Sequence, residues 1–209
     1  MRAVGIVGGS FNPPHLGHLR LAETALTQLE LDEVWLVPVN EPPHKPVLEA
    51  DPGPHHRLEM CRLLLSSSPL AERLAVSGVE IKRGGRSYTV DTLAQLAAEE
   101  PSRKLTLVVG SDMARGLAEW REPRQILALA RLAVALRGDE REEVEAAIAA
   151  IDPKAAPVFL EMEPIEISST AVRARLAEGR DVEDLVGKAV AGYIRKLGLY
   201  GNVALADER

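Results

Sequence analysis

Two histidines lie three residues apart at the start of a predicted helix, directly after a pair of glycines. The segment reads GGSFNPPHLGHLRL and begins at Gly8. Gly8 and Gly9 let the backbone turn tightly while it stays open to a ligand. The i, i+3 spacing of His15 and His18 puts both imidazoles on one helix face, and a helix N-terminus offers free N–H groups and positive potential to phosphate. The pattern predicts two imidazoles that donate to phosphoryl oxygens, with Gly17 leaving room for a nucleotide.

This histidine pair has other interpretations. The segment contains neither GxxxxGK[ST] nor GxGxxG, so it is neither a P-loop nor a dinucleotide-binding turn. A metal site is the rival interpretation, in which the pair is joined by His44, His55 or His56. Metal-binding clusters usually include cysteines or carboxylates at recognisable spacing, and no such spacing accompanies the pair. Phosphate binding is therefore preferred over a metal site and over a purely structural role.

A second polar cluster lies about 150 residues further on, in the string ISSTAVRARL that begins at Ile167. Ser168, Ser169 and Thr170 precede an amphipathic run, which is typical of a helix N-cap. An arginine near a helix N-terminus opposes the macrodipole, so Arg173 needs an anionic partner there. Hydroxyls, free N–H groups and this guanidinium together predict a second phosphate-binding site.

Alternating strand-like and helix-like segments are expected to position both clusters. Short apolar runs alternate with stretches whose apolar residues recur at helical spacing. This alternation implies βαβ crossovers and an α/β fold with a doubly wound parallel sheet, in which ligands bind beyond the carboxyl ends of the strands. The strands are predicted over residues 3–7, 34–39, 75–82, 105–109, 132–136 and 157–160, and the helices over 16–30, 55–65, 88–99, 122–130, 140–151, 168–178 and 188–197.

The overall composition limits the kinds of partner. The chain has 209 residues and a formal net charge of −6, so it lacks a general attraction for phosphate backbones and nucleic acid is not an expected partner. No apolar run approaches the roughly 20 residues of a membrane span, and the N-terminal apolar run breaks at Gly8, unlike a signal peptide. We expect no membrane association and a cytoplasmic location. The single cysteine, Cys61, is expected in a helix core without a disulfide.

These strings resemble the motifs of a known enzyme family. HLGH, residues 15–18, is similar to the HxGH signature of the nucleotidylyltransferase superfamily. The longer string GGSFNPPH, residues 8–15, resembles the bacterial nicotinate-nucleotide adenylyltransferases in particular. ISSTAVR, residues 167–173, resembles the ISSTxxR motif that holds the ATP triphosphate in that family. A lone SSTxxR string is weak evidence, but the two motifs together are specific.

The resemblance covers residues 3–200 and implies how the chain is organised. It implies a Rossmann-like fold in a single domain, residues 1–209, with a small C-terminal helical appendage from about residue 165 to 200 packed on it. The segment 87–89 would recognise the nicotinate carboxylate, largely through backbone donors at the start of a helix. Trp120 would stack on the pyridine ring, and Asp112 would bind ribose hydroxyls.

The resemblance also implies a role for each candidate site residue. His15, His18 and Arg173 would be catalytic and would serve the transferring and leaving phosphates. ATP binding is implied for Gly8, Gly9, Ser10, Phe11, His15, Gly17, His18, Lys45, Gly110, Asp112, Ile167, Ser168, Ser169 and Arg173. Binding of the nicotinate nucleotide is implied for Asn12, Ser87, Tyr88, Thr89, Asp112 and Trp120. The simpler alternatives are an exposed loop lysine at 45, a core tyrosine at 88 and a core tryptophan at 120.

The reaction implied is transfer of AMP from ATP to nicotinate mononucleotide, giving deamido-NAD and pyrophosphate in NAD biosynthesis. The phosphate of the mononucleotide is already a nucleophile, so we expect direct in-line attack without a covalent enzyme intermediate, catalysed by positioning and electrostatics. Mg²⁺ is the expected cofactor, bound through substrate phosphates. ATP and nicotinate mononucleotide are the expected partners, and a homo-oligomer is compatible with the sequence. Two alternatives remain: another adenylyltransferase, such as one acting on phosphopantetheine, and a nucleotide-sensing protein that has lost catalysis.

Overall fold

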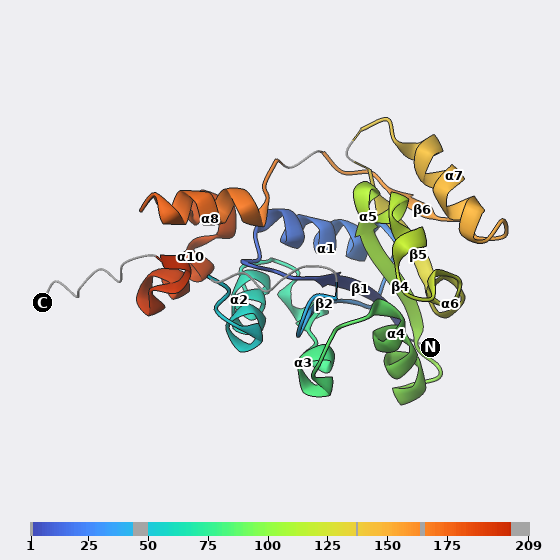
Figure 1. Ribbon diagram of the computed structural model, residues 1–209, viewed down its shortest axis with the longest axis horizontal. Helices are drawn as coiled ribbons and strands as arrows, with labels where there is room; N and C mark the ends of the chain where they lie inside the picture. The colour runs from blue at the N-terminus through green and yellow to red at the C-terminus, as the bar shows by residue number, and fades with distance from the viewer. Residues whose placement is uncertain (1, 44–49, 137, 164–165, 202–209) are drawn as a thin grey trace, which may run out of the picture.

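A parallel β-sheet forms the centre of the molecule (Figure 1). The computed structural model describes residues 2–43, 50–136, 138–163 and 166–201. These residues form a six-stranded sheet in the order β3-β2-β1-β4-β5-β6, and each neighbouring pair is parallel. The predicted α/β fold with a doubly wound parallel sheet is confirmed. The strands are β1 (Ala3–Gly9), β2 (Glu33–Pro38), β3 (Leu74–Val76), β4 (Lys104–Gly110), β5 (Arg131–Ala135) and β6 (Val158–Leu160).

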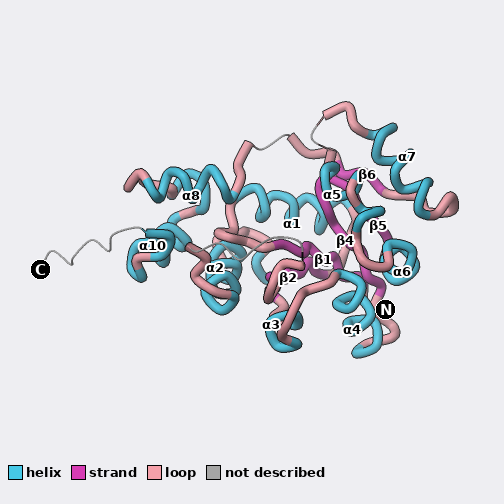
Figure 2. Tube along the Cα trace, viewed as in Figure 1, coloured by secondary structure: helices cyan, strands magenta, loops and turns pink. Residues whose placement is uncertain are grey.

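Helices cover both faces of this sheet, as the tube in Figure 2 shows. Each face has its own cluster of buried apolar side chains. One cluster includes side chains of α1 (Leu16–Gln28), α2 (Pro54–Leu65), α8 (Ser169–Ala177), α9 (Glu183–Val186) and α10 (Lys188–Leu197). The other includes side chains of α3 (Val79–Arg83), α4 (Thr89–Glu99), α5 (Ser111–Arg115), α6 (Pro123–Leu129) and α7 (Arg141–Ile151). No helix in the described ranges is long and apolar enough to cross a bilayer.

The two central strands, β1 and β4, both end in glycine at the carboxyl edge of the sheet. They are near-continuous apolar runs, as expected of parallel strands that are buried on both faces. The chain leaves β1 toward β2 and later crosses to β4 on the other side, which makes the β1–β4 boundary a switch point where ligands bind. A Cβ built on Gly8 or Gly110 would meet no atom within 4 Å, so these strand ends are open to a ligand.

The predicted strand over residues 75–82 is wrong in its second half. β3 ends at Val76, and a short helix, α3 (Val79–Arg83), follows directly after Gly78. The alternation of Val79 and Ile81 indicated a strand, but the helical turn buries Val79 next to Glu80 instead. α5 and α9, with five and four residues, were not predicted because one turn of helix shows no recognisable period.

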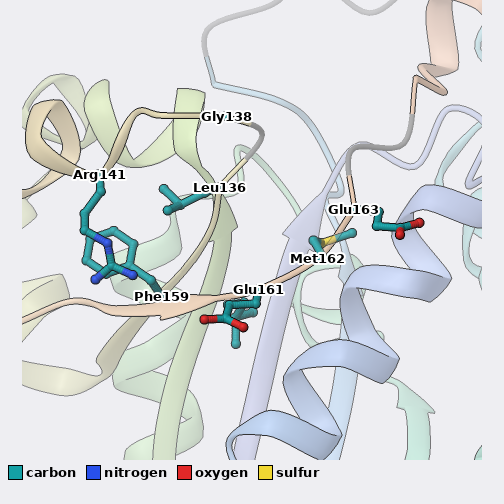
Figure 3. A pocket seen from close by; sticks show the side chains of 8 residues that line it. Leu136, Gly138, Arg141, Phe159, Glu161, Met162 and Glu163 are labelled. Carbon is teal, nitrogen blue, oxygen red and sulfur yellow. The ribbon is translucent and has the colours of Figure 1, made fainter.

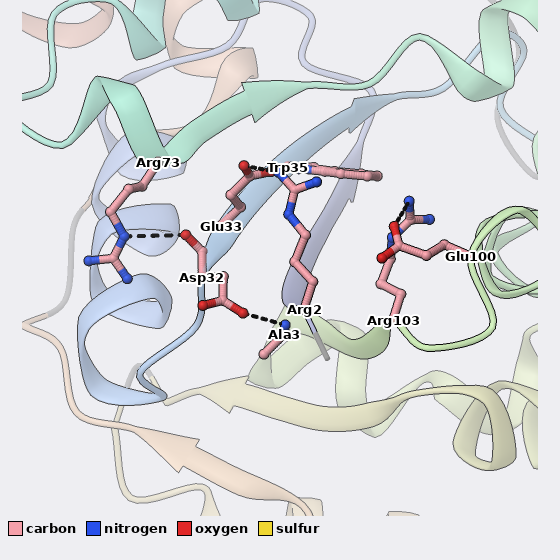
Figure 4. Close-up of polar contacts among 8 residues, drawn as sticks. All are labelled: Arg2, Ala3, Asp32, Glu33, Trp35, Arg73, Glu100 and Arg103. Carbon is pink, nitrogen blue, oxygen red and sulfur yellow. Dashed lines mark hydrogen bonds and ion pairs between the residues drawn. The ribbon is translucent and has the colours of Figure 1, made fainter.

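Polar contacts fix the amino edge of the sheet, where the strands begin (Figure 4). This edge is opposite the carboxyl edge, where β1 and β4 end in glycine. Arg73 donates to the main-chain carbonyls of Leu31 and Asp32, the latter at 3.2 Å. The indole N–H of Trp35 donates to Glu33 at 2.7 Å, and Trp35 is half-buried rather than fully in the core. These contacts hold the start of β2.

Candidate active site

The histidine pair lies where β1 runs into α1. His15 is the N-cap of α1, and His18 is the third residue of the helix. Their ring centroids are 3.7 Å apart. The backbone N–H of His15 donates to Nδ1 of His18 at 3.1 Å. A neutral His18 whose Nδ1 accepts must carry its proton on Nε2, so it presents an N–H donor on the far side of the ring.

Burial, and then the neighbouring His15, lower the pKa of His18 well below its usual 6.5. The imidazole is therefore neutral at physiological pH. The ring of Phe11 lies against it edge-on, with the two ring centroids 4.8 Å apart. Phe11 is itself almost fully buried beside Gly9. His18 is thus fixed as a directional donor rather than as a cation.

The pH dependence of stability tests this assignment. The pKa of His18 is lower in the folded chain than in the unfolded chain. Below a pH of about 6.5 the unfolded state binds a proton that the folded state does not, so stability falls as the pH falls. Between about pH 7.5 and about pH 5.5 we expect calorimetry to show a larger drop in melting temperature for the wild type than for His18→Gln. Equal drops would contradict an imidazole of His18 that stays neutral in the folded chain.

Helix α8 brings the second motif against the first. Ser168 is the N-cap, and its Oγ accepts from the N–H of Ala171 at 3.1 Å. The hydroxyl of Ser169 donates to the carbonyl of Pro13 at 2.8 Å. Nη1 of Arg173 donates to the carbonyl of Asn12 at 2.6 Å. The N-terminus of α8 therefore lies beside the loop that leads to the histidine pair, although about 150 residues separate the two motifs.

The guanidinium of Arg173 keeps capacity for an anion. Its Nη2 donates to Oγ1 of Thr170 at 3.1 Å, and its remaining contact is to a main-chain carbonyl. Over the part of the chain that the structure describes, no carboxylate forms an ion pair with Arg173. Uncharged partners leave the positive charge uncompensated, which suits a phosphate group.

The segment 87–89 begins helix α4, as the sequence predicts. Tyr88 is the N-cap. Oγ of Ser87 accepts from the backbone N–H of Asn40 at 2.9 Å, and the N–H of Ser87 donates to the carbonyl of Glu41 at 2.9 Å. The first N–H groups of a helix lack intrahelical partners, so the N–H groups of Thr89 and Val90 are not used by the helix itself, whereas that of Asp91 donates to the carbonyl of Tyr88 at 3.1 Å. The carboxyl end of β2 holds this start of α4 in place.

Asp112 and Trp120 both lie in the segment that follows β4. Asp112 follows Gly110 on α5, is exposed, and accepts from Arg115 at 2.6 Å. Arg115 also contacts Glu140 and Glu143 of the α7 region. Trp120 is half-buried and packs against the core. Asp112 therefore lies just beyond the carboxyl end of β4.

The remaining predicted residues divide into two groups. Gly8, Gly9 and Ser10 form the exposed or half-exposed end of β1, Gly17 lies in the first turn of α1, and Ile167 directly precedes the N-cap of α8. Lys45, predicted to bind ATP, lies outside the described residues, as does His44 of the alternative metal site.

A cavity of about 480 Å³ opens at the carboxyl ends of β5 and β6 (Figure 3). The guanidinium of Arg141 lies over the ring of Phe159, with 4.2 Å between Cζ and the ring centroid. The sequence carries no motif at these positions, and this cavity was not predicted. Its lining residues are Leu136, Gly138, Arg141, Phe159, Leu160, Glu161, Met162 and Glu163.

Sequence reasoning also missed a buried arginine. Arg57 of α2 is 2 % exposed and pairs with Asp51, with 3.2 Å between Nε and Oδ1. A signal was present in the sequence, because Arg57 shares the i, i+3, i+4, i+7 face with Met60, Cys61 and Leu64, which are all buried. A charged residue on an apolar helix face needs a buried partner.

One ligand of the alternative metal site, His56, has another partner in the structure. Within the described residues no group of three His, Cys, Asp or Glu side chains is arranged to hold a metal ion. His56, one of the proposed ligands, instead shares a hydrogen bond of 2.9 Å with the hydroxyl of Tyr193.

The fold and the site together define a nucleotidyltransferase, and residues 6–175 match the family described as cytidylyltransferase-like. A probable nicotinate-nucleotide adenylyltransferase of Synechococcus sp. (strain JA-2-3B'a(2-13)) is 39% identical over 95% of this chain and 97% of its own. The homologue of that name in Salinibacter ruber is 41% identical over 94% of this chain and 97% of its own. The chain therefore belongs to the nicotinate-nucleotide adenylyltransferase family.

Solved structures support the fold. The nicotinic acid mononucleotide adenylyltransferase of Plasmodium falciparum complexed with NaAD superposes with a TM-score of 0.79, at 20% identity, over 97% of this chain and 98% of its own. A putative nicotinate-nucleotide adenylyltransferase from Vibrio parahaemolyticus gives a TM-score of 0.68, also at 20% identity, over 96% of each chain. The predicted Rossmann-like architecture is confirmed.

Proposed function

We propose that this protein transfers AMP from ATP to nicotinate mononucleotide and releases deamido-NAD and pyrophosphate, a step of NAD biosynthesis. The observation that supports the proposal most strongly is the contact between α8 and the loop after β1. Through that contact an arginine whose described partners are uncharged and a fixed imidazole donor lie on one edge of the sheet. Two polyanionic substrates need such donors on both sides of the reacting phosphorus.

The proposed mechanism is a direct in-line displacement. A phosphate oxygen of the mononucleotide attacks the α-phosphorus of ATP, a new P–O bond forms, and the bond to the β-phosphate oxygen breaks with release of pyrophosphate. Nε2–H of His18 donates to the transferring phosphate, with His15 beside it. Arg173, Ser168 and the N–H groups of α8 hold the leaving phosphates. No covalent intermediate is required, and burial raises the pKa of the Cys61 thiol, which makes it an inert nucleophile.

Mg²⁺ is the proposed cofactor. The described residues offer imidazole, hydroxyl and guanidinium groups around the reacting position rather than a set of carboxylates. Mg²⁺ keeps several waters and is commonly bound through substrate phosphates with few protein ligands, so this donor set fits an ion that arrives with the triphosphate. When bound, it would neutralise charge on the β and γ phosphates.

The two substrates are proposed to occupy different halves of the carboxyl edge of the sheet. The cavity beyond β5 and β6 offers apolar walls and the Arg141–Phe159 pair, which suit an adenine ring. Trp120 and the start of α4 offer a stacking surface and N–H donors, which suit nicotinate. Asp112 would accept from ribose hydroxyls by exchanging its contact with Arg115. Lys45 remains a proposed phosphate contact from the sequence alone.

Pyrophosphate release with ATP and a panel of acceptors tests this function. The panel contains nicotinate mononucleotide, nicotinamide mononucleotide and phosphopantetheine, with mass spectrometry of the product. We expect deamido-NAD as the preferred product. Preferred turnover of phosphopantetheine would establish the other adenylyltransferase, and ATP binding without turnover of any acceptor would establish the nucleotide sensor.

Arg173→Ala is expected to raise the KM for ATP far more than the KM for nicotinate mononucleotide. A hydrogen bond to a charged group contributes about 1.5–3 kcal/mol, so the KM for ATP should rise roughly tenfold or more. Arg175→Ala is the matched control, because Arg175 lies on the same helix but pairs with Asp184 at 2.9 Å. Steady-state kinetics in both substrates decide the outcome. Two unchanged KM values for Arg173→Ala would remove this residue from the triphosphate site.

A further inference from the structure

One buried arginine bonds three separate segments at the carboxyl edge of the sheet. Nη1 of Arg57 donates to the carbonyl of Ser10 at 2.8 Å. Nη2 donates to the carbonyl of Asn40 at 3.0 Å, and Nε donates to Oδ1 of Asp51 at 3.2 Å. Ser10 follows β1 and Asn40 follows β2. A single planar guanidinium with a fixed geometry of donors therefore joins the loops after two neighbouring strands.

Asp51 extends these contacts toward the phosphate-binding residues. Its Oδ1 also accepts from the N–H of Gly53 at 2.8 Å, and its Oδ2 accepts from Nδ2 of Asn12 at 3.0 Å. The carbonyl of Asn12 in turn accepts from Arg173. A continuous series of hydrogen bonds thus leads from Arg57 to the residue proposed to hold the triphosphate.

Asn40 extends the contacts in the other direction, toward the acceptor. Its backbone N–H donates to Oγ of Ser87, and its Nδ2 donates to the carbonyl of Gly85 at 3.0 Å. Ser87 immediately precedes the N-cap of α4. The segment proposed to bind nicotinate is therefore held by the same loop that Arg57 holds.

We propose that Arg57 is a positioning residue for AMP transfer. It fixes the separation between the loop after β1 and the loop after β2, and it thereby sets the position of one substrate relative to the other. The inference rests on the proposed function. In-line transfer requires the reacting atoms close together, and a misplacement of about 1 Å can cost about 10²-fold in rate. Lysine would keep the charge but is a point donor on a flexible stem, so it cannot hold Ser10, Asn40 and Asp51 together.

The first test compares Arg57→Lys with Arg73→Lys. Arg73 also donates to two main-chain carbonyls, but it does so at the amino edge of the sheet (Figure 4). We expect Arg57→Lys to lower kcat about tenfold, short of the limit of about 10²-fold for misplacement, with both KM values nearly unchanged. Arg73→Lys should leave kcat within about twofold of wild type, whatever its melting temperature. Equal kcat values for the two variants would overturn the proposal.

The second test separates positioning from stability. Asp51→Asn removes the charge partner of Arg57 while keeping the size of the side chain. If Arg57 acts through Asp51, the double variant Asp51→Asn/Arg57→Lys should lose no more kcat than the worse single variant, because coupled residues are not additive. Multiplied losses would contradict the proposal. If Arg57→Lys fails to fold, Asp51→Asn alone decides, and a kcat within about twofold of wild type at an unchanged KM would reject the inference.

A measurement without turnover keeps this inference separate from the proposed function. Amide hydrogen–deuterium exchange should quicken at residues 9–12 and 40–41 in Arg57→Lys, because those segments lose their common anchor. It should stay unchanged there in Arg73→Lys. A wild type inactive with every acceptor would reject the proposed function and, with it, the catalytic consequence of positioning. Unchanged exchange in Arg57→Lys, with an active wild type, would reject the positioning role alone.

Discussion

Replacing His18 by alanine is expected to lower kcat by about 10²–10³, the usual cost of removing one preorganised donor from a developing charge. The ring is fixed on one side by the His15 N–H and on another by Phe11. Its Nε2–H therefore donates in a set direction without reorganising during the reaction. The measurement is steady-state kcat at saturating concentrations of both substrates, with the melting temperature recorded alongside.

The conservative variants show which nitrogen acts. Glutamine can put an N–H group near the position of Nε2, and asparagine can put one only near Nδ1. His18→Gln should therefore keep more activity than His18→Asn. His55→Ala is the matched control, since His55 is an exposed histidine on α2. Near-wild-type turnover of His18→Ala would remove this residue from the mechanism, and a collapse of the melting temperature would indicate a structural role instead.

The second large expected effect is a preference of roughly 10²-fold in kcat/KM for nicotinate mononucleotide over nicotinamide mononucleotide. The two substrates differ in the group on the pyridine ring, which is a carboxylate in nicotinate mononucleotide and a carboxamide in nicotinamide mononucleotide. Backbone N–H groups at the start of α4 suit two accepting oxygens, whereas a carboxamide directs its own donors at them. Each unpaired buried group costs about 1–3 kcal/mol, and each 1.4 kcal/mol is about tenfold.

An acidic residue in the first turn of α4 bears on this preference between the two acceptors. The carboxylate of Asp91 would accept hydrogen bonds from the carboxamide and repel the carboxylate of nicotinate. Arg121 lies against Asp91, however, with 3.4 Å between Nη1 and Oδ2. The same guanidinium lies over the Tyr88 ring, 4.8 Å from its centroid. The pair is exposed, so its contribution to stability is small, yet it offsets the negative charge beside the proposed nicotinate position.

The preference is measured as kcat/KM for both acceptors at saturating ATP. Trp120→Ala is the control, because stacking serves either ring and its loss should lower both values by a similar factor. The ratio between the acceptors should then stay nearly constant. Equal values for the two acceptors in the wild type would refute a carboxylate-reading helix start and indicate a dual-specificity enzyme.

The main fold and the helix starts that carry the two motifs could be predicted because they depend on local patterns. Apolar runs that end in glycine gave the central strands, and Ser168 before an amphipathic run gave the start of α8. What could not be predicted depends on contacts between distant segments. Arg57 forms a hydrogen bond with Ser10, which lies 47 residues earlier in the sequence. The cavity beyond β6 forms only when β5 and β6 are paired. Helix α3 was misassigned because a five-residue alternation fits one helical turn as well as a strand.

The contact between α8 and the loop after β1 has a consequence for the chain as it is made. Pro13 and Ser169, which share a hydrogen bond, are 156 residues apart. At about 5–20 residues per second, roughly 8–30 s of synthesis separate them. Closing so long a loop also costs entropy that only the finished contacts repay. A growing chain therefore carries the histidine pair for most of its synthesis without the arginine that would complete the proposed phosphate site, so that proposed site is finished only after α8 has emerged.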